Sequence, residues 1–139
     1  MNIKQASQHS GVSPQNIRYY EREGLLHPQR DPNNDYRQYS DKDLHTLKLI
    51  RILRMLDMPL EDIRSVMEGT ATLPQVLQNQ EQRLQEQSEK LQAAIRFCRE
   101  LKVSGQNTEQ LDVDECLTRM EKAPKAEGFF VGWIQDYKR

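Results

Sequence analysis

The sequence predicts a mainly α-helical protein: a winged helix-turn-helix head with a small β-hairpin wing, a long coiled-coil dimerisation helix and a short helical C-terminal segment. Three observations support this fold class. Two short helical stretches are separated by a glycine, a turn-rich stretch separates two short strand-like segments, and about thirty later residues carry apolar side chains at heptad spacing.

The first two helices have clear start and stop signals. The first covers residues 3–10 and ends at Gly11. The second begins with Ser13, a good N-cap, and Pro14, which suits the first helical position because no N–H is needed there, and it ends at Gly24. Two helices around a glycine turn form the helix-turn-helix pattern, although many other helical hairpins share it.

The outer face of the second helix carries groups that suit nucleic acid. At 100° per residue, Ile17 and Tyr20 lie on the inner side. The outer side presents Gln15, Arg18, Tyr19 and Arg22. Such groups reach phosphates and base edges in a major groove, and arginine can bond guanine with two hydrogen bonds. An ordinary solvated helix face has the same composition, so this helix alone leaves both interpretations open.

A β-hairpin wing is predicted next. Residues 25–27 and 37–39 are short enough to be paired strands, and the intervening HPQRDPNND is rich in turn residues. Tyr36 and Arg37 face opposite sides of the second strand. A wing after a recognition helix rests on the backbone of the adjacent groove, where Arg37 could hold a phosphate and Tyr36 could donate to one.

Two further helices complete the predicted head. One runs from Ser40 to about Leu56 and the other covers residues 60–68. The inner face of the first carries Leu44, Leu47, Ile50 and Leu53. Its polar side carries a basic stripe of Lys48, Arg51 and Arg54. Solvation explains this stripe best, although Arg54 near the helix end could reach a phosphate.

The longest predicted helix begins at Thr72 and Pro74 and ends near Val103. Its heptad a and d positions hold Leu73, Leu77, Leu84, Leu91, Ala94, Cys98 and Leu101, with Gln80 and Gln87 interrupting the seam. At 1.5 Å per residue this helix is roughly 45 Å long, and an apolar stripe of that length needs a partner helix. We therefore favour a two-chain coiled coil, with the six positions from Leu77 onward as dimer contacts, over a surface helix packed by loops.

The end of the chain is predicted to hold one more helix and an aromatic cluster. The helix covers residues 109–122, with Leu111, Cys116, Leu117 and Met120 as candidate buried positions. The last segment gathers the large rings Phe129, Phe130, Trp133 and Tyr137. Such a cluster is more often core than ligand pocket, and both interpretations stay open.

Composition limits the function classes. With 36% hydrophobic residues, 29% charged residues and a mean hydropathy of -0.88, the core must be small. Residues 1–70 carry ten basic and ten acidic side chains, and residues 71–139 carry ten and eleven. Bulk charge therefore gives no support to nucleic-acid binding, and any basic footprint must be local.

Several classes of site lack a sequence signal. The N-terminus has no apolar signal region and no eighteen apolar residues run together, so we expect a soluble, cytoplasmic protein without a membrane partner. Cys98 and Cys116 are too far apart for a CxxC site and too few for a disulfide framework. Without a glycine-rich phosphate loop, a nucleophile elbow or a metal motif, we predict no enzyme, no catalytic residue, no metal and no cofactor.

Three stretches follow one another in a specific order: RYYEREGLL after the helix-turn-helix, a wing ending in DYRQYS, and then DLHTLKLIRILRMLDMPLEDIRSVM. Their combination resembles the MerR family of bacterial transcription regulators over residues 1 to about 70. The resemblance implies a DNA-binding domain over residues 1–70, an antiparallel coiled-coil helix over 72–104 and a C-terminal effector region over 105–139.

The same resemblance implies a mechanism. Arg18, Tyr19, Tyr36 and Arg37 would contact operator DNA, and a homodimer would bind a pseudo-palindromic promoter site. A small-molecule inducer, sensed near the C-terminal aromatic cluster, would make the dimer bend and untwist the DNA so that bacterial RNA polymerase engages both promoter elements. One departure concerns the wing, where Asp35, preceded by Asn34, replaces the family's glycine before Tyr-Arg. Both residue types tolerate positive φ, so we expect the turn to survive.

Two alternatives stay open at this point. The first is a thiol-based metal or redox sensor that uses Cys98 and Cys116, although the cysteine pairs and iron-sulfur spacing of such family members are absent. The second is a helical interaction adaptor that binds no DNA.

Overall fold

The structure is a computed structural model that describes residues 1–122. In chain order it contains α1 (Ile3–Ser10), α2 (Pro14–Arg22), β1 (Gln29–Arg30), β2 (Arg37–Gln38), α3 (Asp41–Met55), α4 (Leu60–Glu68), α5 (Leu73–Ser104) and α6 (Val113–Lys122). The chain divides into two compact units, residues 1–80 and residues 81–139, and we call the first unit the head. The aromatic residues predicted as the effector site, Phe129, Phe130, Trp133 and Tyr137, lie outside the described residues.

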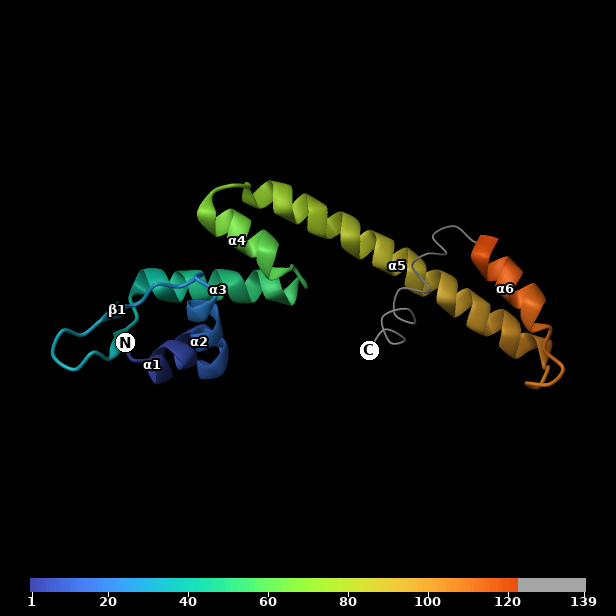
Figure 1. The fold of residues 1–139 in the computed structure, drawn as a ribbon, viewed down its shortest axis with the longest axis horizontal. Helices are drawn as coiled ribbons and strands as arrows, with labels where there is room; N and C mark the ends of the chain where they lie inside the picture. Colours follow the sequence, from blue (N-terminus) through green and yellow to red (C-terminus); the bar gives the residue numbers. More distant parts are fainter. Residues whose placement is uncertain (123–139) are drawn as a thin grey trace. The chain divides into compact units, whose positions relative to one another are not determined.

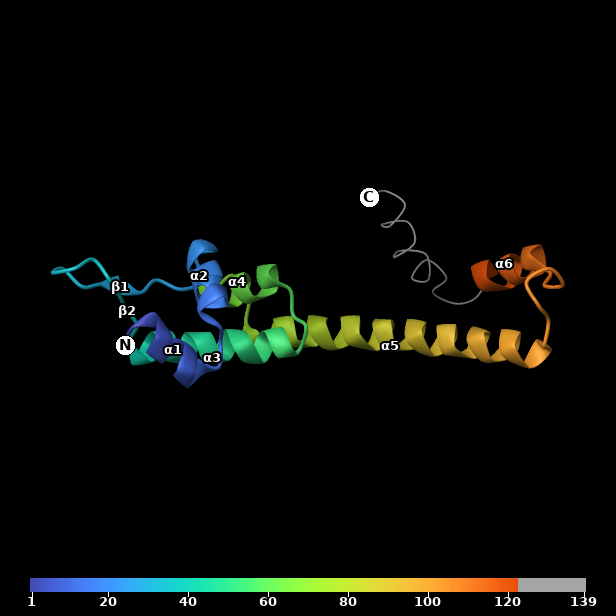
Figure 2. The same ribbon diagram turned by 90° about the horizontal axis from the view of Figure 1, so that it is seen from below.

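The head is a winged helix-turn-helix, as predicted. Helix α1 lies against both α2 and α3, and the hairpin of β1 and β2 extends away from these helices (Figures 1 and 2). The strands are antiparallel, with Gln29 opposite Gln38 and Arg30 opposite Arg37. The helix-turn-helix and its wing are thus carried on one side of α3.

Side-chain caps explain why the helices begin where they do. Asn2 and Gln5 form a reciprocal capping box at α1, with bonds of 2.8 and 2.9 Å. The Ser13 hydroxyl accepts from the backbone N–H of Asn16 at 3.1 Å, and Ser40 caps α3 with help from Asp43. Each cap satisfies an N–H that has no partner within its helix, so these boundaries are set locally and the sequence predicts them well.

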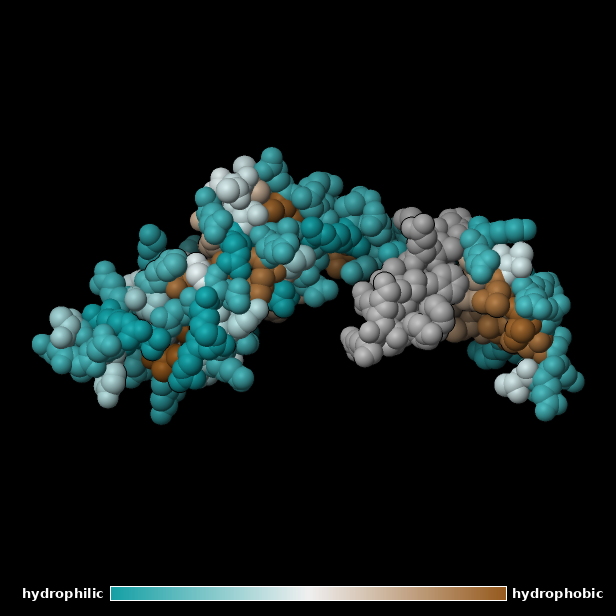
Figure 3. Space-filling view, in the orientation of Figure 1, coloured by the Kyte–Doolittle hydropathy of each residue, from teal (hydrophilic) through white to brown (hydrophobic). Residues whose placement is uncertain are grey.

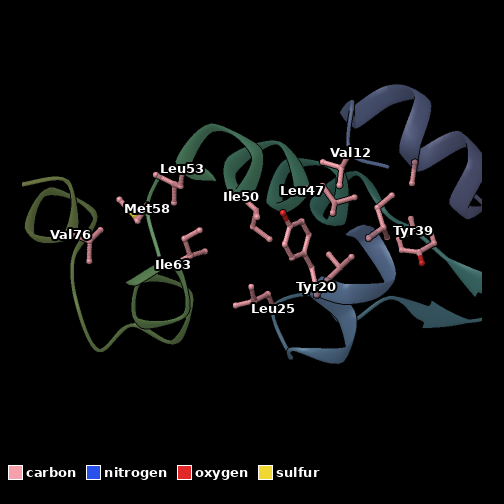
Figure 4. Close-up of a cluster of buried hydrophobic side chains, with 13 residues drawn as sticks. Val12, Tyr20, Leu25, Tyr39, Leu47, Ile50, Leu53, Met58, Ile63 and Val76 are labelled. Carbon is pink, nitrogen blue, oxygen red and sulfur yellow. The ribbon is translucent and has the colours of Figure 1, made fainter. Parts of the chain in front are cut away.

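The core of the head follows one face of α3. Leu47, Ile50 and Leu53 are buried, and Figure 4 shows Tyr20 of α2 reaching toward Ile50 and Leu47. Met58, Ile63 and Val76 continue the same row beyond the end of α3 and are also buried (Figure 4). Burying each large aliphatic side chain contributes about 1.5–3 kcal/mol, so this row contributes substantially to the stability of the head.

The first two turns of α5 belong to the head. Gln80, predicted as an interruption of the coiled-coil seam, is only 4% exposed and donates from Nε2 to the Leu56 carbonyl at 2.8 Å. That carbonyl lies at the C-terminal cap of α3, where the helix cannot supply a partner of its own. Gln80 therefore joins α5 to α3, a role that heptad spacing does not reveal.

The first strand lies later than predicted. Residues 25–27 were expected to form it, but β1 is Gln29–Arg30. Leu25 and Leu26 both enter the head core, and the Leu25 N–H donates to the Tyr20 carbonyl at 2.9 Å. Two consecutive buried side chains do not fit the alternation of a surface strand, so the pairing begins only after the chain leaves the core.

Helix α6 also begins later than predicted, at Val113 instead of residue 109. The Asn107 side chain accepts from the N–H groups of Glu109 and Gln110 and holds a turn, and the Asp112 carboxylate accepts from Glu115 N at the start of the helix. In the second unit α6 and α5 are joined by the Arg119–Glu100 ion pair.

Apolar side chains of the second unit are partly exposed. Figure 3 shows apolar surface over α6 and the adjacent end of α5, where Val103, Val113 and Leu117 are exposed. The prediction that Leu117 is buried was therefore wrong for this single chain. No helix among residues 1–122 has the length and apolar character needed to cross a membrane.

We predict that Gly11→Ala destabilises the head more than Gly24→Ala. Both glycines have φ near +76° to +77°, so both variants bear the strain of a left-handed alanine, about 1 kcal/mol. At Gly11 the added Cβ also overlaps the Arg51 guanidinium, which donates to the Ser10 carbonyl, whereas nothing lies near Gly24. Losing the bond from Arg51 to the Ser10 carbonyl adds about 1 kcal/mol to the destabilisation of Gly11→Ala.

Urea unfolding of both variants measures this difference. Adding Arg51→Ala to each should abolish it, since the overlap and the bond are then gone from both. If Gly11→Ala and Gly24→Ala lower the free energy of unfolding equally, Arg51 moves aside without an energetic cost.

Candidate nucleic-acid interface

The outer face of α2 has the predicted composition. Gln15, Arg18 and Arg22 are exposed and Tyr19 is half-buried, whereas the inner residues Ile17 and Tyr20 are buried. The burial of the inner side fixes which side of this short helix is presented to solvent.

Tyr19 connects the two faces of α2. Its ring centroid lies 5.8 Å from that of Tyr20, at an interplanar angle of 55°, and the Arg22 guanidinium carbon lies 6.0 Å from the Tyr19 centroid. Rings at this separation and tilt attract one another, and a guanidinium over a ring is attracted by its quadrupole. Tyr19 is therefore held by the core side of the helix and in turn holds Arg22 on the outer side.

The wing tip is built without glycine. Asp35 has φ +59°, so the turn forms with a left-handed residue that is not glycine, in line with the expectation that the turn survives. Asp31 and Asn34 accept side-chain bonds from the N–H groups of Asn33 and Tyr36 at 2.8 and 3.0 Å, and Arg30 donates to both the carbonyl and the carboxylate of Asp35 at 3.2 Å. These local bonds support the turn and leave Tyr36 71% exposed.

Arg37 ties the wing to α2. Its Nε donates to both carboxylate oxygens of Glu21, at 2.8 and 2.7 Å. The bond to Glu21 raises the pKa of the Arg37 guanidinium, which stays charged at every physiological pH. The wing and the second helix of the helix-turn-helix are thus connected by a charge-assisted contact between residues far apart in sequence.

A second arginine ties α4 to the same helix end. Arg64 donates to both the backbone carbonyl and the carboxylate of Glu23, the latter at 3.0 Å. Glu23 is the C-terminal cap of α2, where the carbonyls lack helical partners. Arg37 and Arg64 therefore hold the end of α2 from two different elements.

The basic stripe of α3 (Lys48, Arg51 and Arg54) is exposed, as expected, but two of its arginines also bond backbone carbonyls. Arg51 donates to the Ser10 carbonyl at 3.2 Å, and Arg54 donates to the Met58 carbonyl at 2.8 Å. Both therefore also satisfy carbonyls at helix ends or in loops, a role that the expectation of a solvated stripe did not include. Regular spacing of basic residues cannot distinguish these roles, because the position of the accepting carbonyl is set by the tertiary fold.

Glu21, Glu23 and Arg64 were missed by the sequence analysis. A signal was present, since both glutamates stand in the C-terminal turn of α2, where the helix macrodipole disfavours negative charge. Acidic residues in such a position indicate basic partners from elsewhere in the chain.

Tyr39, at the base of the wing, carries a buried phenol. The residue is 2% exposed, and its hydroxyl oxygen has no hydrogen-bond partner among the residues that the structure describes. Burial, followed by the nearby charge of Glu21, raises the pKa of the Tyr39 phenol above its ordinary value of 10.0.

The two cysteines are in the second unit. Cys98 is exposed and Cys116 is half-buried. Across residues 1–122, no three histidine, cysteine or acidic side chains lie close enough together to hold a metal ion.

Comparison with known proteins agrees with this geometry. Residues 1–70 match the family described as MerR HTH family regulatory protein. The chain is 45% identical over 67 residues to "Heavy metal-dependent transcription regulator 2" of Rhizobium meliloti (strain 1021), an alignment that covers 48% of this chain and 46% of that protein. The chain thus spans about half the length of this relative.

Two solved structures have similar folds. PbrR691 from Ralstonia metallidurans CH34, in complex with lead(II), aligns over 84% of this chain and 98% of its own with a TM-score of 0.68, but at 22% identity it supports the fold alone. HiNmlR, a MerR family regulator lacking the sensor domain and bound to promoter DNA, aligns over 76% of this chain and 90% of its own at 28% identity, with a TM-score of 0.52.

We predict that Tyr39→Phe stabilises the head by about 1 kcal/mol at neutral pH, because it removes a buried hydroxyl without a partner. A raised pKa in the folded state also means that the native protein loses stability as pH rises above the ordinary phenol value of 10.0. The variant should lack this component of alkaline destabilisation.

The free energy of unfolding, measured at pH 7 and through the alkaline range, tests both effects. Tyr36→Phe is the matched control, since that hydroxyl is exposed. A less stable Tyr39→Phe protein would mean that the phenol has a favourable partner after all.

Proposed function

The chain belongs to the MerR family of helix-turn-helix regulatory proteins, and from this we propose that it binds a promoter operator and regulates transcription. The observation that carries the proposal is the exposed polar face of α2, held beside a wing by the Arg37–Glu21 contact. A helix and wing fixed to each other can dock as one surface on a major groove and the adjacent backbone.

We propose two kinds of DNA contact. Gln15, Arg18, Tyr19 and Arg22 of α2 face the major groove, where amides and guanidiniums distinguish base edges. Tyr36 and Arg37 of the wing hold phosphates and fix the register. Arg54 is a further candidate for a phosphate, since its bond to Met58 uses one terminal nitrogen and a guanidinium has five N–H donors.

A homodimer is the second part of the proposal. Leu77, Leu84, Leu91 and Cys98 are exposed in the single chain, and Ala94 and Leu101 are half-buried. These six positions form the predicted seam, and an apolar seam exposed on a long helix is stabilised by a second copy. An antiparallel pairing about a two-fold axis would present two heads to a pseudo-palindromic operator.

Regulation would then act through DNA deformation. The dimer would bind between the two promoter elements and untwist the DNA, which costs a few kcal/mol. A signal molecule that binds two dimer states with different affinities can supply this free energy. RNA polymerase is the partner in this scheme, and the residues after 105 are the proposed region for the signal.

Thiol-based metal or redox sensing is the second candidate. It is favoured by the metal-dependent regulator among the relatives of this chain. It is disfavoured by the eighteen-residue separation of Cys98 and Cys116, which differs from metal-ligand spacing. We therefore favour a small-molecule signal over thiol-based sensing.

We predict that Arg18→Ala and Arg37→Ala weaken operator binding in different ways. Loss of Arg18 should cost about 1–3 kcal/mol and relax base preference at one position, since it removes a base contact. Loss of Arg37 should weaken binding to all sequences and lower the salt dependence by about one phosphate contact.

Both effects are measured by footprinting and titration. The DNA is a duplex that the protein selects from a random-sequence pool. Arg96→Ala, an exposed arginine of α5, is the matched control. Unchanged binding by both head variants would contradict the proposed DNA contacts, and failure of the protein to select any duplex would support an interaction adaptor that binds no DNA.

We predict that the Leu84→Glu/Leu91→Glu variant is monomeric. Opposed carboxylates in an apolar seam replace favourable burial by desolvation and repulsion, and a monomer with one head would bind the operator weakly. Sedimentation equilibrium measures the mass, and Gln85→Glu, an exposed position outside the seam, is the control. A variant that remains dimeric would place the interface elsewhere.

A further inference from the structure

The C-terminal turn of α2 carries two acidic residues in a region where negative charge is unfavourable. Glu21 and Glu23 lie beside the carbonyl end of the helix, where the macrodipole is negative, and on the element proposed to approach DNA phosphates. Both effects act against carboxylates here. Their presence therefore needs another explanation.

Each carboxylate has an arginine partner from a different element. Glu23 pairs with Arg64 of α4, and Glu21 pairs with Arg37 of the wing. The Glu21 side chain is 20% exposed and the Arg37 side chain 40%, so the carboxylate lies on the inner side of the pair and the guanidinium on the outer side.

The geometry of the Glu21 contact leaves the outer end of Arg37 available. Both carboxylate oxygens accept from Nε alone, at 2.8 and 2.7 Å. Within the part of the chain that the structure describes, the two terminal NH₂ groups of Arg37 have no hydrogen-bond acceptor. Four N–H donors of the guanidinium thus remain, in the fork that matches two phosphate oxygens.

We infer that Glu21 is a positioning residue for operator binding: it holds the inner edge of the Arg37 guanidinium so that the terminal N–H groups meet a DNA phosphate. This inference rests on the proposed function, because it needs the Arg37–phosphate contact. Glu21 itself does not touch DNA in this arrangement. Its effect is to fix the guanidinium plane before binding, so that less side-chain freedom is lost in the complex.

A positioning role predicts the opposite change in DNA affinity, on removal of Glu21, from that predicted by simple electrostatics. A glutamate near DNA repels phosphates, so its removal should tighten binding. A glutamate that orients a phosphate-binding arginine should, on removal, weaken binding, by about three- to tenfold for one side chain that must be ordered anew.

The test measures dissociation constants of the full chain for a duplex that it selects from a random-sequence pool, at several salt concentrations. The variants are Glu21→Ala, Glu21→Gln, Arg37→Ala and the double variant Glu21→Ala/Arg37→Ala. Glu68→Ala, an exposed acidic residue at the end of α4, controls for loss of one negative charge. Thermal unfolding confirms that each variant is folded, and Glu21→Gln keeps the size of the side chain if Glu21→Ala does not fold.

We expect Glu21→Ala to bind the duplex more weakly than the unchanged protein. Glu21→Gln, which retains one acceptor oxygen, should have a smaller effect. When Arg37 is already replaced by alanine, Glu21→Ala should not weaken binding further. Such coupling is expected between residues in contact and would not arise from a general loss of stability. Equal or tighter binding by both Glu21 variants, or equal effects with and without Arg37, overturns the inference.

Arg18→Ala, measured in parallel, separates this inference from the proposed function. If Arg18→Ala and Arg37→Ala weaken binding and the Glu21 variants do not, only the positioning role fails. If no duplex is selected, or if neither arginine matters, the proposed function fails and the inference fails with it.

Discussion

Burial of one face of α3 is the constraint on which the head depends. Leu47, Ile50 and Leu53 form a continuous apolar surface that receives Tyr20 from α2 and continues into Met58, Ile63 and Val76. Small helices such as α1 and α2 are marginal alone, because a helix of this length gains little from its own hydrogen bonds. Packing against α3 gives them stability and fixes which side of α2 faces solvent.

Charge then sets the finer geometry of the head. Apolar contacts are non-directional and leave the wing and the end of α2 free to shift, whereas guanidinium contacts have defined planes and donors. Arg37 and Arg64 supply such contacts at Glu21 and Glu23, and Arg51 fixes the turn between α1 and α2 through the Ser10 carbonyl. All three contacts are between elements far apart in the sequence, so they align the parts of the proposed DNA-binding surface as one body.

The long helix α5 has two different environments along its length. Its first turns are part of the head, through buried Val76 and the bond from Gln80 to the Leu56 carbonyl. Beyond residue 80 its seam is largely exposed in the single chain, with Leu91 66% exposed. One continuous helix thus serves both the fold of the head and, in the proposed dimer, the contact between subunits.

The sequence by itself determined the features that are decided within a few residues: the caps at Ser13 and Ser40, the buried and outer faces of α2, and the left-handed turn at Asp35. These depend on local hydrogen bonds and helical periodicity, which adjacent residues specify. Only the tertiary structure decided where Leu25 and Leu26 lie, that Gln80 caps α3, and that Arg37 and Arg64 brace the end of α2 through Glu21 and Glu23. The physical reason is that a charged or amide side chain can bond water or any acceptor within reach, and only packing of the distant elements brings one particular acceptor to it.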